Sequence, residues 1–416
     1  MGIADLIYRV LQGAPLAIEA YDGSSAGPPD AVATIFVRSP DALNRFITAP
    51  NDLGLGRAYV AGDLDYEGDL FGALHAIARV DLHLDRGLLT DLVKAVGPSG
   101  LKPLPPPPEE ARMHGSRHSR SRDAAAVSYH YDLSNEFYRL MLGPSMTYSC
   151  AVWEDPSVGL DAAQAAKHEL ICQKLALKPG MRLLDVGCGW GGMALHAAEH
   201  HGVEVVGVTV SARQVEAAME RVKDAGLAGQ VDIRLQDYRD VDDGPFDAIS
   251  SIGMFEHVGR KRLATYFSHL RELLRPEGRL LNHGICRPPV ARDALPVNVP
   301  KTPLARRTFI NRFVFPDGEL HELGTVISSM QQQGFEIRHT ETLREHYGLT
   351  LRAWVANLEA NWDEAVRLAG LGRARVWRLY TAASAVGFED ARIQVHQMLA
   401  VRTEAGRSGF PLRPAY

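Results

Sequence analysis

Short apolar runs alternate with amphipathic stretches through the central part of the chain. Five of these runs have the length of buried β-strands, at residues 182–186, 203–208, 231–235, 246–252 and 279–283. Helices are predicted to begin near Met193, after the first strand, and to cover residues 212–225, after the second. Strands and helices that alternate at this spacing are typical of a parallel sheet with helices on both faces. The pattern therefore predicts an α/β fold for this region.

The first hundred residues follow another pattern. Residues 32–40 alternate apolar and polar positions like a strand, and Ser39 before Pro40 is typical of a helix start. Residues 53–70 contain several glycines and are predicted to form turns, whereas residues 70–93 are predicted to be helical. Because no residues with catalytic spacing occur here, we expect residues 1–100 to form a smaller α+β domain with a supporting or docking role.

A segment rich in proline and basic residues separates these two regions. Four consecutive prolines at 105–108 favour an extended, semi-rigid backbone, and six histidines and arginines follow within residues 112–122. Residues 101–122 are therefore interpreted as a linker. The basic part is either a solvated strip or a contact for anionic phospholipid, where each cation near the surface contributes roughly 1 kcal/mol.

Composition and charge narrow the class of protein. A chain of 416 residues with 46% apolar residues is long enough for about two to three domains with buried cores. The formal net charge of −5 provides no basic field, so no nucleic-acid partner is expected. The N-terminus lacks the apolar core of a signal peptide, and no run of about 18 apolar residues indicates a membrane span. The expectation is a soluble, cytoplasmic protein.

Cysteine usage points to the same compartment. The four cysteines are Cys150, Cys172, Cys188 and Cys286. Their irregular spacing, without a CxxC pair, argues against a disulfide framework and against structural zinc. A reducing environment and no metal site are therefore expected.

The sequence DVGCGWGG at residues 185–192 follows the first predicted strand. Gly187 and Gly189 would let the backbone turn sharply beside a ligand, and Gly191 would allow close helix packing. Asp185 at the strand end could hold the ammonium group of an amino acid. A dinucleotide site would need G-x-G-x-x-G and an acidic residue about 20 positions later. The G-x-G-x-G spacing found here, without that carboxylate, favours a methyltransferase loop over a dinucleotide site or a purely structural turn.

Three further segments make the pattern specific. They are HYDLSNEFYRLMLGPSMTYSCAVW at 130–153, MFEHVG at 254–259 and HYGLTLRAW at 346–354. With the glycine loop, the chain resembles the cyclopropane-fatty-acid synthase family and its mycolic acid methyltransferase relatives over about residues 128–401. The resemblance implies a class I methyltransferase fold, a Rossmann-like parallel sheet with helices on both faces. Residues 123–405 would form the catalytic domain and 406–416 a tail.

The resemblance also implies S-adenosylmethionine as the cofactor. The residues expected to bind it, from the loop and the matching motifs, are Tyr131, Tyr148, Ser149, Asp185, Gly187, Gly189, Gly191, Thr209, Gln214, Asp237 and Tyr238. The acceptor would be the double bond of an unsaturated acyl chain. A general base cannot activate an alkene as a nucleophile, so positioning, exclusion of water and aromatic stabilisation of a carbocation must drive the methyl transfer.

Family members hold a bicarbonate ion that takes the proton lost on ring closure. The matching positions in this chain are Cys150, Glu256, His283, Ile285 (through its backbone) and Tyr347. Two anions would meet at Glu256, so a proton must lie between them or the bicarbonate must donate. The resemblance therefore predicts a catalytic set of five residues and bicarbonate as a second cofactor.

The product and the surroundings of the reaction stay open. The cation can close to a cyclopropane, or it can shift a hydride and give a methylene group, the precursor of a 10-methyl branch. A non-catalytic lipid-binding protein is the alternative of another class. The expected substrate is a phospholipid acyl chain at the inner membrane surface, reached through residues 1–100, the basic strip or residues 287–315. A homodimer is a family expectation.

Overall fold

The computed structural model describes residues 2–80, 86–113, 115, 119–120, 122–123, 129, 133–289, 308–414 and 416. The chain divides into two compact units. Unit 1 comprises Met1–Arg112, Val290–Pro316 and Asn361–Val386, and unit 2 comprises Met113–Pro289, Asp317–Ala360 and Gly387–Tyr416. This division joins two later segments to the N-terminal region, whereas the sequence suggested continuous domains. The domain boundaries expected from the sequence stay a prediction.

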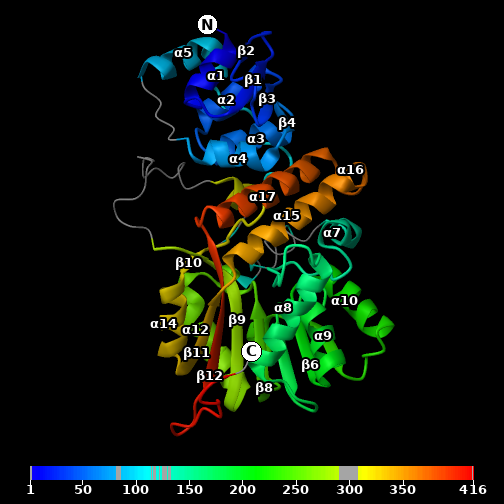
Figure 1. The fold of residues 1–416 in the computed structure, drawn as a ribbon. Helices are drawn as coiled ribbons and strands as arrows, with labels where there is room; N and C mark the ends of the chain where they lie inside the picture. The colour runs from blue at the N-terminus through cyan, green and yellow to red at the C-terminus, as the bar shows by residue number, and fades with distance from the viewer. Residues whose placement is uncertain are drawn as a thin grey trace. The chain divides into compact units, whose positions relative to one another are not determined.

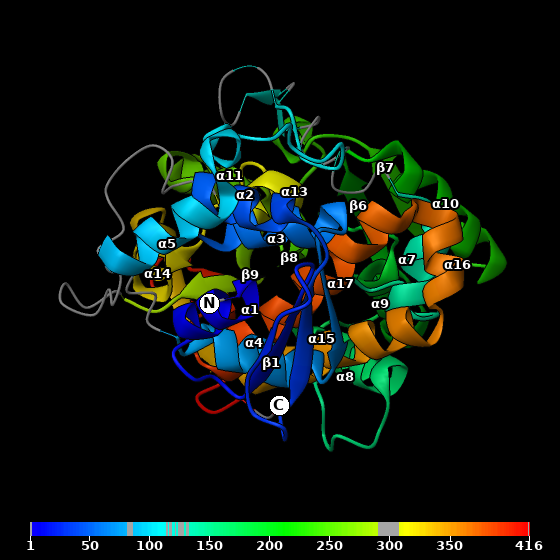
Figure 2. The same ribbon diagram turned by 90° about the horizontal axis from the view of Figure 1, so that it is seen from above.

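Unit 1 is built on a four-stranded sheet with the order β2-β1-β3-β4. Its strands are β1 (Leu16–Ala20), β2 (Ser25–Ala26), β3 (Ala33–Val37) and β4 (Leu64–Gly68), and only β1 and β3 are parallel. Its helices are α1 (Ile3–Val10), α2 (Pro40–Thr48), α3 (Asp52–Ala61), α4 (Leu70–Ala78), α5 (Arg86–Val96), α13 (Phe309–Phe313) and α16 (Trp362–Ala369). Helix α1 lies beside β1 (Figure 2). The predicted α+β character of this region is confirmed.

Sequence patterns located α2 and the helical stretch that contains α4 and most of α5, and they missed α3. As predicted, α2 begins after Ser39, whose hydroxyl accepts a hydrogen bond from the Asp41 amide. The prediction of turns over residues 53–70 is wrong, because they contain most of α3 and all of β4. A Cβ on Gly54 would lie 2.1 Å from the Ala49 carbonyl oxygen, and one on Gly56 would lie 2.2 Å from the Phe309 ring. These glycines therefore serve close packing rather than chain reversal.

Part of the predicted linker packs within unit 1. The Glu110 carboxylate is only 1% exposed and forms ion pairs with Arg57 and Arg312. In the basic part, which from Met113 onward belongs to unit 2, Arg122 pairs with Asp317 and is mostly buried. Residues 114, 116–118 and 121 of that strip lie outside the described residues. Arg122 is therefore held by an ion pair inside unit 2 and is not part of a solvated strip.

Unit 2 contains an eight-stranded sheet in the order β11-β12-β9-β8-β5-β6-β7, with β10 also paired to β9. The strands are β5 (Arg182–Val186), β6 (Glu204–Thr209), β7 (Val231–Leu235), β8 (Phe246–Ile252), β9 (Leu274–Arg287), β10 (His321–Glu322), β11 (Phe335–Thr342) and β12 (Gln394–Arg402). All pairs formed between strands β5 to β10 are parallel. Strand β12 runs antiparallel to both β9 and β11. The predicted strands are confirmed; β9, between β8 and β12 in Figure 1, extends well beyond its predicted ends.

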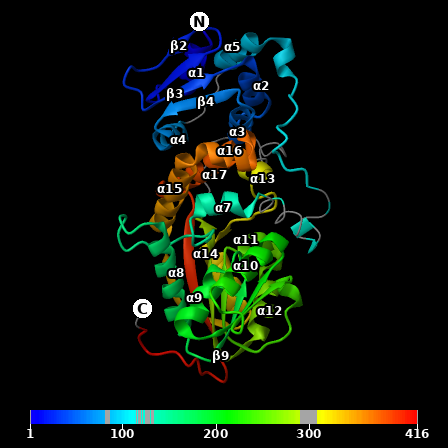
Figure 3. The same cartoon turned by 90° about the vertical axis from the view of Figure 1, so that its right-hand side faces the viewer.

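Two apolar cores lie on opposite faces of this sheet, as alternate side chains of a strand require. On one face pack α8 (Leu160–Leu175), α9 (Gly192–His201) and α10 (Ala212–Asp224); on the other pack α11 (Phe255–Val258), α12 (Leu263–Leu273) and α14 (Leu323–Gln332). Figure 3 shows α8 and α9 across the sheet from α12. The remaining helices are α7 (Asn135–Leu142), α15 (Arg344–Ala360) and α17 (Leu371–Glu389), which continues from unit 1. The predicted class I arrangement, with helices on both faces, is confirmed.

No helix of the described residues is long and apolar enough to cross a bilayer.

Candidate active site

The glycine loop turns between β5 and α9. Gly187, Gly189 and Gly191 have φ values of +76°, +56° and +78°, which are strained for any residue with a Cβ. A Cβ on Gly187 would lie 2.5 Å from Met254 Cγ, whereas one on Gly189 would meet nothing within 4 Å. The backbone at Gly189 therefore borders open space beside the first turn of α9, where helix amides can bind a polar ligand.

Asp185 is the last residue but one of β5, beneath this loop. Its side chain is buried, and its Oδ1 accepts a hydrogen bond of 2.7 Å from the Ser250 hydroxyl. Burial raises the pKa of Asp185 to about 6, against the lowering effect of the Ser250 hydrogen bond and the nearby Lys167 ammonium. The carboxylate can thus be ionised at neutral pH and can hold a cationic group.

Helix α8 fixes the segment that carries Tyr148, Ser149 and Cys150. The Lys167 ammonium donates to the Ser149 hydroxyl at 3.1 Å, and the Gln164 amide donates to the Ser149 carbonyl at 2.9 Å. Burial lowers the pKa of Lys167 to about 7, while Cys150 and Asp185 act to raise it. Lys167 therefore links Asp185, beneath the glycine loop, to the Ser149–Cys150 segment.

Sequence reasoning missed Gln164 and Lys167. Both are buried on α8, three residues apart and on the face that also carries Ile171. A polar pair repeated at helical spacing within an apolar face is a readable signal, because buried polar groups need partners.

Glu256 and His283 point buried, unpartnered atoms into the protein. Glu256 Oε1 accepts a hydrogen bond of 2.7 Å from the Ile285 amide, and its Oε2 has no partner among the described residues. His283 Nε2 likewise has none within that part of the chain. Burial raises the pKa of Glu256 to about 7 despite the Ile285 amide, and burial together with nearby Lys167 holds the pKa of His283 well below its usual range. Near neutral pH, Glu256 can hold or release a proton and His283 is neutral.

A relay of side chains sets the tautomer of His283. The Lys174 ammonium donates to Gln397 Oε1 at 2.7 Å, so the amide nitrogen of Gln397 faces His283 Nδ1, at 3.3 Å. An amide nitrogen only donates, so Nδ1 accepts and the ring proton lies on Nε2. His283 therefore presents a hydrogen-bond donor at its unpartnered position.

Glu256 is brought to β9 by a close helix contact. A Cβ on Gly284 would lie 2.1 Å from the Phe255 ring, so only glycine allows α11 to approach the strand this closely. The Gly253 amide also donates to the His283 carbonyl at 2.8 Å.

Shared neighbours join Cys150 and Tyr347 to the same group. The Leu343 carbonyl accepts from the Tyr347 amide at 3.1 Å and from the Cys150 thiol at 3.6 Å. The Leu343 amide donates to the carbonyl of Val395, which pairs with Ile285 across β12 and β9. Contacts through Leu343 and Val395 therefore connect Cys150 and the Tyr347 backbone to Ile285, whose amide donates to Glu256.

The thiol and the aromatic rings define the character of this site. Burial raises the pKa of Cys150 well above its usual range, so the side chain is a thiol and not a nucleophilic thiolate. The Tyr148 ring stacks on Trp354 at 5.2 Å, and the Tyr347 ring lies 6.0 Å from Trp354. Trp354 was not predicted, although it ends one of the matching segments. The electron-rich faces of these rings are suited to stabilise a carbocation.

The other residues expected at the cofactor lie at the ends of β6 and β7. Thr209 donates from its hydroxyl to Gln214 at 2.8 Å, and the Asp237 carboxylate pairs with Arg239. The Tyr238 ring packs edge-on against Tyr266 at 5.0 Å, and burial raises the pKa of Tyr238 to about 12. Tyr131 lies outside the described residues. Cofactor contact by all eleven residues expected from the sequence stays a prediction.

Comparison with known proteins identifies the family. Residues 118–398 match the family described as mycolic acid cyclopropane synthetase. The chain is 44% identical over 413 residues to a probable fatty acid methyltransferase of Mycobacterium tuberculosis, covering 96% of this chain and 94% of that protein. The chain belongs to this family.

Two further family members carry more specific names. The cyclopropane-fatty-acyl-phospholipid synthase of Escherichia coli is 36% identical over 373 residues, covering 89% of this chain and 88% of that protein. The crystal structure of a mycolic acid cyclopropane synthase complexed with SAH and CTAB superposes with a TM-score of 0.60 at 35% identity, covering 67% of this chain and 97% of that one. The chain is thus an S-adenosylmethionine-dependent methyltransferase of the cyclopropane synthase family, acting on fatty acyl chains. The alternative of a non-catalytic lipid-binding protein is set aside.

Proposed function

We propose that this enzyme transfers a one-carbon unit from S-adenosylmethionine to the cis double bond of a phospholipid acyl chain and closes a cyclopropane ring. In this reaction the alkene attacks the sulfonium methyl, the carbon–sulfur bond breaks, and a carbocation forms on the acyl chain. Loss of a proton from the new methyl group then lets the ring close. The observation that carries the proposal is the pair of buried, unpartnered atoms, Glu256 Oε2 and His283 Nε2.

A small anion suits this pair. His283 offers a donor at Nε2, and Glu256, with a pKa of about 7, can carry the proton that two neighbouring anions must share. Bicarbonate, held by these groups with Cys150, Tyr347 and the Ile285 backbone, would supply the base that takes the proton from the new methyl group. The aromatic rings would stabilise a carbocation without the covalent capture that a carboxylate in direct contact would bring.

Product analysis tests the reaction and separates the two outcomes. Cells that express the protein and receive oleate are expected to accumulate a fatty acid heavier by one CH₂, detected by mass spectrometry. A cyclopropane resists double-bond derivatisation, whereas a methylene isomer of equal mass reacts. A derivatised product would favour the alternative fatty acid methyltransferase, as the name of the M. tuberculosis relative suggests. No new product would contradict both.

The phospholipid substrate and a cytoplasmic location at the membrane surface belong to the same proposal. The phospholipid substrate is supported by the name of the E. coli relative. Purified enzyme should modify oleoyl phospholipid in vesicles faster than free oleate, and an equal rate on both would contradict a membrane-presented substrate. A homodimer stays an expectation of the family.

The two loop glycines should respond differently to alanine. Each substitution adds strain of about 1–2 kcal/mol at positive φ. Gly187→Ala also forces a Cβ against Met254, so it should lower the melting temperature further, whereas Gly189→Ala places its methyl in open space. If the cofactor lies there, Gly189→Ala should weaken S-adenosylmethionine binding in calorimetry with the smaller stability loss. Unchanged binding would move the cofactor away from Gly189.

Lys167→Met should make cofactor binding depend on pH. Without the ammonium, the pKa of Asp185 rises above about 6, so less of the carboxylate is ionised near neutral pH. An opposite charge nearby shifts a pKa by about 1–3 units, so affinity for S-adenosylmethionine near pH 6.5 should fall by at least about threefold and should recover at higher pH. Lys174→Met removes another buried lysine of α8 and should leave this pH profile as in the wild type. A pH-independent loss would contradict the role of Asp185.

A further inference from the structure

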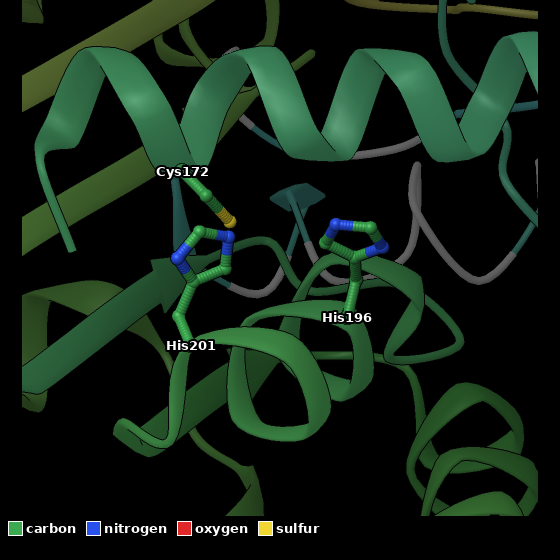
Figure 4. Close-up of side chains that lie close together, drawn as sticks. All are labelled: Cys172, His196 and His201. Atoms are coloured by element: carbon green, nitrogen blue, oxygen red, sulfur yellow. The ribbon is translucent and has the colours of Figure 1, made fainter. Parts of the chain in front are cut away.

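A second group of polar side chains lies between α8 and α9. A nitrogen of His196, a nitrogen of His201 and the Cys172 sulfur all lie within 4.8 Å of one another. Figure 4 shows the thiol descending from α8 and the two rings rising from α9 toward it. Glu169, one helical turn before Cys172, places its Oε2 at 3.3 Å from His196 Nε2 and 3.0 Å from His201 Nε2. The Cys172 thiol and the two imidazoles thus lie close enough to share one ion, and the Glu169 carboxylate contacts both rings.

We propose that Glu169, Cys172, His196 and His201 form a binding site for one divalent transition-metal ion, with zinc the best fit. One thiolate, two imidazoles and one carboxylate are ligands that zinc accepts in tetrahedral geometry. Zinc–nitrogen bonds of about 2.0–2.1 Å place neighbouring tetrahedral ligands roughly 3.3 Å apart. The two distances from the Glu169 carboxylate to the imidazole nitrogens match that spacing.

Burial is graded across the site. Cys172 is fully buried, the side chains of His196 and His201 are 13% and 18% exposed, and that of Glu169 is 39% exposed. An ion could enter from the Glu169 side and reach a sulfur held in the apolar core. The expectation of no metal site rested on paired cysteines, and a site with a single cysteine escapes that test.

The position of the site suggests a structural role. Helix α9 begins directly after the glycine loop, and α8 holds the Ser149 segment through Gln164 and Lys167. An ion shared by Glu169 and Cys172 of α8 and the histidines of α9 would join these two helices. The proposal does not depend on which product the enzyme forms.

Metal titration of the full-length protein tests the site. After removal of bound metal with a chelator, the protein should bind about one Zn²⁺ per chain by equilibrium dialysis and elemental analysis, and its melting temperature should rise. Co²⁺ in the same site should give a thiolate-to-cobalt charge-transfer band. Failure to bind zinc at this stoichiometry would overturn the proposal, whether or not the enzyme is active.

Single substitutions distinguish this site from surface binding. Cys172→Ser, of nearly the same size, should abolish the charge-transfer band, and His201→Gln should weaken zinc binding by more than the roughly 10–100-fold that outer ligand partners cost. His200→Gln is the matched control, because this exposed histidine of α9 lies outside the group and its loss should change neither readout. Zinc binding that survives both Cys172→Ser and His201→Gln, or that is lost equally with His200→Gln, would overturn the assignment. If Cys172→Ser does not fold, His201→Gln alone decides.

Discussion

Glu256→Gln is expected to lower turnover by about 10²–10⁴-fold, the range that a positioned proton-transfer group contributes. The glutamine oxygen can still accept from the Ile285 amide, so β9 and α11 should keep their arrangement. What is lost is a group that can both take and give a proton at the buried Oε2 position near neutral pH. Single-turnover kinetics measures the loss, and calorimetry should show S-adenosylmethionine affinity within about twofold of the wild type.

Glu319→Gln is the matched control for this variant. The Glu319 carboxylate also accepts from a backbone amide, that of Arg260, and the Glu319 amide donates to the Glu256 carbonyl. Its removal should therefore report any general disturbance near α11 without touching the buried acid. Undiminished turnover in Glu256→Gln would remove the residue from proton transfer, and equal losses in both variants would indicate a structural effect.

The parallel core of unit 2 could be predicted from the sequence because its strands are buried on both faces. Runs such as residues 246–252 are apolar or small apart from Asp247, and such runs allow few other structures. Helix α3 could not be predicted, because Gly54 and Gly56 read as turn residues. A Cβ at these positions would collide with the carbonyl of Ala49 and the ring of Phe309. These contacts become visible only in the packed structure.

The candidate site likewise contains residues that the sequence could predict and residues that it could not. Glu256 and His283 lie in short motifs that the family resemblance carries, so their residue numbers could be predicted. Lys174 and Gln397 lie on α8 and β12, far apart in the sequence and outside any motif. They matter only because the fold places one beside the other and both beside His283, a relation that depends on the antiparallel pairing of β12 with β9. Local pattern contains no trace of such a contact.

Gln397→Glu should therefore impair the enzyme strongly although the residue touches neither proposed substrate. A carboxylate can only accept, so it would draw the ring proton of His283 to Nδ1 and leave a lone pair at Nε2, where the proposed anion needs a donor. A wrong tautomer of a catalytic histidine costs up to about 10⁴-fold in a serine protease, and we expect roughly 10²-fold or more here. Lys174 would pair with the new carboxylate, so the melting temperature should change little.

The relay is tested by measuring both turnover and the position of the His283 ring proton in the same variant. Nitrogen-15 chemical shifts of the His283 ring should report a proton on Nε2 in the wild type and on Nδ1 in Gln397→Glu. Gln394→Glu, on the same strand, contacts His396 instead and should keep wild-type turnover, which controls for an added negative charge on β12. Full activity with a changed tautomer would show that His283 has no role in proton transfer. Lost activity with an unchanged tautomer would instead make Gln397 a packing residue, because the imidazole would then have kept its donor at the site.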